Sequence, residues 1–148
     1  MTGLVYTHSH ADHFGGARGV LEQERVDSGE VPVIAPAGFT EHAVAENVFA
    51  GTAMSRRAGY MYGAALDRGP LGQVGAGLGQ TTSVGSVTLI PPTVHVTTTG
   101  QEVVVDGVRM VFQLALGPAR RRPRCISCCP TCGRCAWRRT PPTCSTTS

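Results

Sequence analysis

The alternation of apolar and polar residues in the first part of the chain predicts two strands separated by a helix. Residues 4–6 form a short apolar run, and residues 31–35 form a second one with Pro32 near its start. Residues 17–25, between these runs, have the composition of a short helix. A strand, a helix and a strand within this length predict a βαβ unit and therefore an α/β fold built in layers.

The rest of the apolar pattern predicts two more helices and then an antiparallel sheet. Helices are predicted at residues 40–49 and 52–66, and a glycine-rich loop at residues 68–79. Strands are predicted at residues 86–90, 101–105 and 108–114. Asp106-Gly107 suits a two-residue hairpin turn between the last two strands. This second half would form one sheet layer of a larger sandwich.

The densest group of candidate functional residues directly follows the first predicted strand. His8, His10, Asp12 and His13 share one tight turn in the spacing His-x-His-x-Asp-His. Neutral imidazole nitrogens and carboxylate oxygens are donors that zinc takes from proteins. The spacing supplies two histidines for one ion, and an aspartate and a histidine for a second. We therefore predict these four residues as metal ligands; the alternative is a polar turn whose histidines lie in water.

Size and charge exclude several classes of function. The chain has 148 residues, enough for one domain with a core of its own. We predict no membrane span and no signal peptide, because no apolar run is long enough and no basic stretch precedes one; the location stays undetermined. The net charge of +3 comes from arginines gathered near the C-terminus without an aromatic platform, so we predict no nucleic-acid surface.

Several further segments narrow the interpretation beyond the metal-binding turn. They are Phe14-Gly15-Gly16, Val-Ile-Ala-Pro-Ala-Gly-Phe at residues 33–39, Glu-His-Ala-Val-Ala-Glu-Asn at 41–47, Ala-Met-Ser-Arg-Arg-Ala at 53–58 and Leu-Ile-Pro-Pro-Thr at 89–93. With these segments, residues 2–115 resemble the bacterial alkyl sulfatases of the metallo-β-lactamase superfamily. The resemblance implies a partial αβ/βα sandwich of the metallo-β-lactamase type.

The resemblance also implies a two-zinc hydrolase of long-chain primary alkyl sulfates. His8 and His10 would bind one zinc ion, and Asp12 and His13 the other. The ion pair would hold the sulfate group and lower the pKa of a bound water, and Asp12, as the candidate catalytic residue, would orient that water. Full-length enzymes of this kind are larger and dimerise through a helical region, and we expect this chain to lack that region.

Residues 116–148 differ in composition from everything before them. All six cysteines lie there, seven of the 13 arginines lie between Arg120 and Arg139, and no acidic residue follows Asp106. The segment has no apolar periodicity. We therefore predict an incomplete metallo-β-lactamase-like domain at residues 1–115 and a disordered Arg/Cys-rich tail at residues 116–148.

The tail departs from the resemblance directly after Ala115. The family continues there with Pro-Gly-Thr-Glu-Ala-Pro, a strand and Glu-Asn-Ala-Thr-His, and both glutamates are metal ligands in the family. The codons of residues 126–147 can also be read in a shifted frame, in which the third base of each codon is combined with the first two bases of the next. This shifted reading can encode the stretch Glu-Asn-Ala-Thr-His. We interpret the tail as the same gene in a shifted frame. The alternative is a metal or iron–sulfur knuckle, given the spacing of Cys125, Cys128, Cys129, Cys132 and Cys135.

Three hypotheses about function remain open from the sequence. In the first, the chain is a zinc-dependent hydrolase of alkyl sulfate esters with an incomplete site. In the second, it is a non-catalytic remnant, because four ligands shared by two ions leave two for each, whereas zinc sites take three or four from the protein. In the third, the same fold hydrolyses another ester, a thioester or a lactam.

Overall fold

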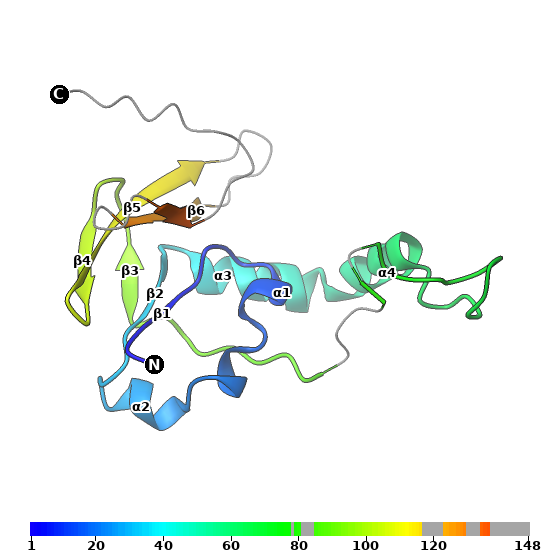
Figure 1. The fold of residues 1–148 in the computed structure, drawn as a ribbon, viewed down its shortest axis with the longest axis horizontal. Coiled ribbons are helices and arrows are strands. Elements are labelled where there is room, and N and C mark those ends of the chain that lie inside the picture. The colour runs from blue at the N-terminus through cyan, green and yellow to red at the C-terminus, as the bar shows by residue number, and fades with distance from the viewer. Residues whose placement is uncertain (78, 81–84, 117–122, 130–133, 137–148) are drawn as a thin grey trace.

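Two sheets organise the computed structural model, which describes residues 1–77, 79–80, 85–116, 123–129 and 134–136. The first sheet is parallel, with the strands β1 (Leu4–Val5), β2 (Val33–Pro36) and β3 (Val94–Val96) in that order. The second is antiparallel, in the order β4 (Glu102–Val105), β5 (Val108–Leu116), β6 (Pro123–Cys129) and β7 (Arg134–Ala136). This mixture of helices and strands confirms the predicted α/β class (Figure 1).

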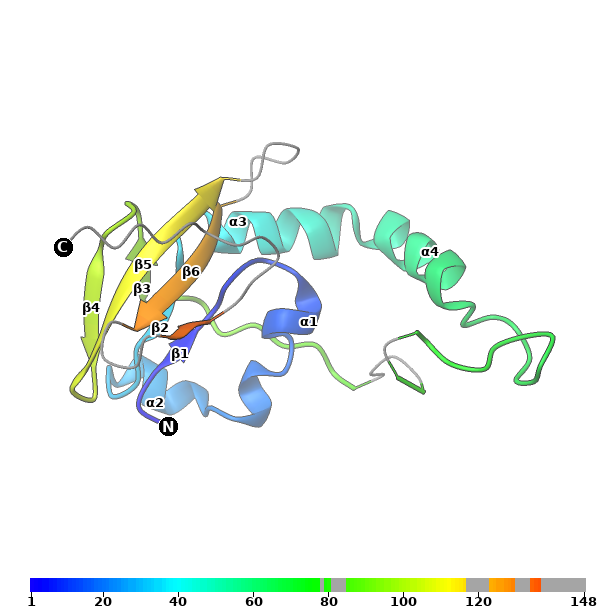
Figure 2. The same cartoon turned by 45° about the horizontal axis from the view of Figure 1, so that its top comes forward.

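The helices lie mostly in the first half of the chain. In chain order they are α1 (Ala11–Phe14), the 3-10 turn η1 (Ala17–Gly19), α2 (Gln23–Asp27), α3 (Phe39–Val44), the π-helical turn η2 (Ala45–Phe49) and α4 (Gly51–Tyr62). Figure 2 shows α3 and α4 following one another away from the sheets. No helix in the described part of the chain combines the length and the apolar character needed to cross a bilayer.

β2 is buried on both faces, because its alternate side chains enter two hydrophobic clusters. Val33 and Ala35 face a cluster on the helical side of the parallel sheet. Ile34 faces the other way and packs with Val96 and Phe112, between the two sheets. The result is a helical layer, a parallel sheet and an antiparallel sheet, which is the predicted partial sandwich.

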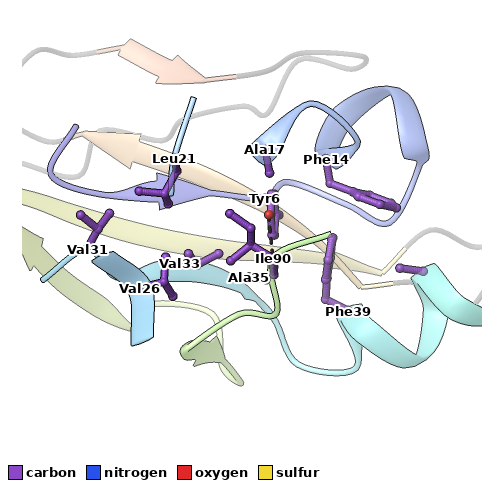
Figure 3. Packing of buried hydrophobic residues seen from close by; sticks show 11 residues of the cluster. Tyr6, Phe14, Ala17, Leu21, Val26, Val31, Val33, Ala35, Phe39 and Ile90 are labelled. Atoms are coloured by element: carbon purple, nitrogen blue, oxygen red, sulfur yellow. Dashed lines mark hydrogen bonds between the residues drawn. The ribbon is translucent and has the colours of Figure 1, made fainter. Parts of the chain in front are cut away.

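Tyr6 joins the end of β1 to the helical layer. Its ring stacks on Phe39 at 4.8 Å between centroids and meets Phe14 edge-on at 6.3 Å. Its hydroxyl donates to the carbonyl oxygen of Ile90 at 3.2 Å, the dashed line in Figure 3. Burial raises the pKa of the Tyr6 hydroxyl, and the hydrogen bond to Ile90 acts in the opposite direction. This contact holds the residues that follow β1 against the core.

Several predicted elements differ from the observed ones. The helix predicted at residues 17–25 is broken into η1 and α2, with Gly19, a poor helix former, at the break. The strand predicted at residues 86–90 is wrong, since Thr88 alone forms a single bridge, to Gly16. β3 was missed. The Asp106-Gly107 turn is confirmed, with φ of 51° and 74° at its two residues.

Part of the tail for which we predicted disorder forms strands. β6 pairs with β5 from Val111↔Cys128 to Leu116↔Pro123, and β7 pairs with β6. The edge of β5 opposite β4 offers backbone donors and acceptors to any segment that can extend beside it, whatever its side chains, and β6 takes that place. The side chains of the tail, and with them the possible cysteine knuckle, lie outside the described residues.

Candidate metal site

The predicted metal-binding turn lies at the carboxyl end of β1. Leu4 and Val5 pair with β2, and the Tyr6 amide donates to the carbonyl oxygen of Ile34 at 2.8 Å. The chain then leaves the sheet and enters α1 at Ala11. Crevices beyond the carboxyl ends of parallel strands are the usual ligand sites of α/β sheets. The turn therefore occupies the edge of the sheet at which a site is expected.

Backbone contacts make α1 short and tight. His10 caps the helix in an extended conformation, and its carbonyl oxygen accepts from the His13 amide at 2.9 Å. The Gly15 amide donates to the carbonyl oxygen of Ala11 at 2.7 Å. A Cβ at position 15 would lie 2.6 Å from that same oxygen, so only glycine fits there. The Phe14-Gly15 pair thus ends the turn that carries the predicted ligands.

The three histidines of the turn lie together. The ring centroid of His8 is 4.7 Å from that of His10 and 4.1 Å from that of His13. His8 is buried, and its Nδ1 lies 3.0 Å from the hydroxyl oxygen of Thr7. With the proton on Nδ1, His8 donates to Thr7, and Nε2 is the nitrogen that carries the lone pair. We call His8, His10 and His13 the imidazole cluster.

Asp12 lies at the solvent side of the imidazole cluster. Its Oδ2 is 3.5 Å from Nε2 of His13, and its side chain is 77% exposed. Asp12 is in the first turn of α1, where the helix dipole favours a negative charge. The carboxylate is therefore accessible to both water and a neighbouring ligand of the cluster.

The donor chemistry of the turn fits a divalent metal ion, whereas the side chains have not converged on one point. Imidazole nitrogens and a carboxylate are zinc donors. Among the described residues, no group of three or more His, Cys, Asp or Glu side chains is arranged to hold an ion. These residues therefore fit a divalent ion by the chemistry of their donors, and not by the arrangement of their side chains.

The sequence analysis missed one charged residue beside the cluster. Glu46, in η2, is 4% exposed, and its Oε1 lies 3.5 Å from Nε2 of His10. Phe39, Ala43 and Glu46 are at positions i, i+4 and i+7, and the first two belong to the core. A glutamate on the apolar stripe of a helix was therefore the available signal.

A protein-family model matches the part of the chain that contains this turn. The Metallo-beta-lactamase superfamily matches residues 2–111, about three quarters of the chain. The chain belongs to this superfamily. Membership confirms the predicted fold class, and metallo-β-lactamase proteins use metal ions. The match includes the whole imidazole cluster and both strands that support it.

Several proteins similar to this chain are named as alkylsulfatases. A linear primary-alkylsulfatase of Pseudomonas sp. is 59% identical over 114 residues, covering 77% of this chain and 17% of that protein. An alkyl/aryl-sulfatase of Saccharomyces cerevisiae is 49% identical, covering 77% and 18%. A solved stereoselective inverting sec-alkylsulfatase from Pseudomonas sp. superposes with a TM-score of 0.76 at 44% identity, covering 88% of this chain and 20% of that one. The chain thus spans about a fifth of the length of these relatives.

Proposed function

We propose that residues 1–115 carry the first half of the metal centre of a zinc-dependent hydrolase of alkyl sulfate esters. His8 and His10 would hold one zinc ion, and Asp12 and His13 a second. The observation that carries the proposal is the imidazole cluster at the carboxyl end of β1, with centroids 4.1 and 4.7 Å apart. The alkylsulfatase names of the relatives support the sulfate ester as substrate.

The predicted ligands would have different roles in such a site. Bound zinc supplies Lewis acidity toward a sulfate oxygen and makes water more acidic. His8 is held by burial and by Thr7, so it presents one fixed nitrogen. Asp12 is the candidate catalytic residue, because its exposed carboxylate can accept a hydrogen bond from the attacking water and orient it. The products are an alcohol and hydrogen sulfate.

The test uses the purified 148-residue chain. Zinc per chain is measured by mass spectrometry, and alcohol release from dodecyl sulfate is followed in the same samples. We expect Asp12→Asn to lower the rate by about 100-fold or more, in the range of general base loss, while exposed His95→Ala leaves it unchanged. Equal rates in the wild type and Asp12→Asn would contradict the role of Asp12.

A non-catalytic remnant is the second candidate. One observation favours it: the described side chains include no converged group of three or more donors. This candidate predicts weak zinc binding with no alcohol release. Parallel assays with another ester, a thioester and a lactam distinguish both candidates from a metallo-β-lactamase hydrolase of different specificity.

A further inference from the structure

Glu46 is a charged side chain in a place where charge is costly. It is 4% exposed and follows two core residues of α3, Phe39 and Ala43. Burial of a carboxylate is unfavourable unless hydrogen-bond donors or positive charges surround it. We therefore expect the buried carboxylate of Glu46 to be stabilised by donors or positive charges beside this face of the helix.

The contacts of η2 connect it with the histidine turn. Glu46 Oε1 lies 3.5 Å from Nε2 of His10, at ion-pair distance. The side-chain amide of the next residue, Asn47, donates to the carbonyl oxygen of Ser9 at 3.4 Å and to that of Ala43 at 2.8 Å. A π-helical turn widens the helix by one residue, and such turns recur at functional sites. Two successive side chains of η2 thus contact two successive residues of the turn.

We propose that Glu46 is a positioning residue that selects the metal-binding nitrogen of His10. The carboxylate, at 3.5 Å from Nε2 of His10, would favour the tautomer that carries its proton on Nε2, which leaves the lone pair on Nδ1. His10 then presents Nδ1 to a metal ion, whereas His8, whose Nδ1 faces Thr7, presents Nε2. This inference rests on the proposed function, since it gives the imidazole cluster its orientation toward zinc.

The competing explanation is a purely structural one, in which Glu46 only holds η2 against the turn. Both explanations predict some loss of stability when Glu46 is replaced. They differ in the tautomer of His10 and in zinc affinity at equal foldedness, so these two quantities are the ones to measure.

The first experiment measures zinc affinity of the full chain by competition with a chromophoric chelator at neutral pH. Loss of an outer-sphere partner lowers metal affinity by about 10- to 100-fold, and we expect this for Glu46→Ala. Glu46→Gln, which keeps the shape and an acceptor oxygen, should recover part of the loss. Glu41→Ala, an exposed glutamate of α3, is the matched control and should bind zinc as the wild type does. Unchanged affinity in folded Glu46→Ala would overturn the proposal.

The second experiment reads the tautomer in the metal-free chain, and so separates this inference from the proposed function. Protonated and unprotonated ring nitrogens have well separated 15N shifts. We expect His10 to carry its proton on Nε2 in the wild type and to become a mixture in Glu46→Ala. Wild-type His10 protonated on Nδ1 overturns the proposal, even where Glu46→Ala fails to fold. A wild type with the expected tautomer that takes up no zinc would refute the proposed function alone.

Discussion

The segment around β2 and the arm formed by residues 48–74 use apolar residues in opposite ways. Every residue of β2 is buried, and its neighbours fill two continuous clusters. In the arm, α4 contains no buried residue, and Phe49 and Tyr60 are 85% and 88% exposed. Figure 1 shows the arm extending away from both sheets. Similar residue types therefore give a core in one region and an exposed apolar surface in the other.

The difference shows that the local apolar pattern determines where a helix forms, whereas tertiary packing determines whether its apolar side chains are buried. Apolar spacing in residues 52–66 predicts a helix, and α4 forms through Tyr62, where Gly63 ends it with φ of 62°. Among the described residues, none of those in that helix is buried. An exposed apolar patch of this kind marks a contact surface or an aggregation site. The core segment owes its stability to burial, and the arm does not.

The largest expected difference in stability is between the loss of a tyrosine in the core, Tyr6, and the loss of one in the arm, Tyr60. We expect Tyr6→Ala to lower the free energy of unfolding by about 3–5 kcal/mol, because it leaves a cavity among Phe14, Phe39 and Ile90. Tyr60→Ala should change it by under about 0.5 kcal/mol. Urea midpoints of the full chain provide the measurement. Equal costs at the two positions would break the comparison.

A second prediction concerns self-association through the arm. The paired substitution Phe49→Ser and Leu71→Ser removes two large exposed apolar side chains. We expect most concentration-dependent association to disappear in sedimentation velocity, with little change in the urea midpoint. Phe39→Ser, in the core, is the contrasting variant and should unfold the chain. Association that persists in the double variant would show that another surface is responsible.

The smallest expected effect on stability comes from the exposed ion pair between Arg25 and Glu30, which precedes β2. Arg25 donates a hydrogen bond to Glu30, which lowers the pKa of Glu30 below its ordinary value of 4.5. A lowered pKa in the folded state stabilises the fold above pH 4.5, and this contribution is lost as the pH falls through the folded-state pKa. Glu30→Gln should therefore flatten the acid limb of the stability curve slightly. A difference between the wild-type and variant curves that stays constant as the pH falls from above 4.5 into the acid range would contradict this contribution of the pair.

Sequence reasoning succeeded where one local signal was strong. β2, the helix near residues 39–49 and the Asp106-Gly107 hairpin all follow from periodicity or turn chemistry. β3 was missed because it has three residues with an exposed histidine in the middle, and its partner β2 is distant in the chain. Glu46 was missed as a neighbour of the site because its burial depends on how α3 and η2 pack.

The tail at residues 116–148 marks a different limit of sequence reasoning, because no apolar periodicity or structural role explains why it is rich in arginine and cysteine. We predict one inserted or missing base between the codons of Ala115 and Arg120. Determination of the nucleotide sequence there is the measurement, and an unbroken frame in independent reads would contradict the prediction. In that case the cysteine knuckle becomes the leading interpretation of residues 116–148.

Zinc uptake by the imidazole cluster is the central claim, and it has a direct measurement. The full chain and a His8→Ala, His10→Ala, His13→Ala variant are dialysed against zinc, and bound metal per chain is determined by mass spectrometry. Thiols of the tail are blocked by alkylation in both samples, so that they hold no metal. The account predicts bound zinc in the wild type and its near-complete loss in the variant. Equal zinc in the two samples would contradict it.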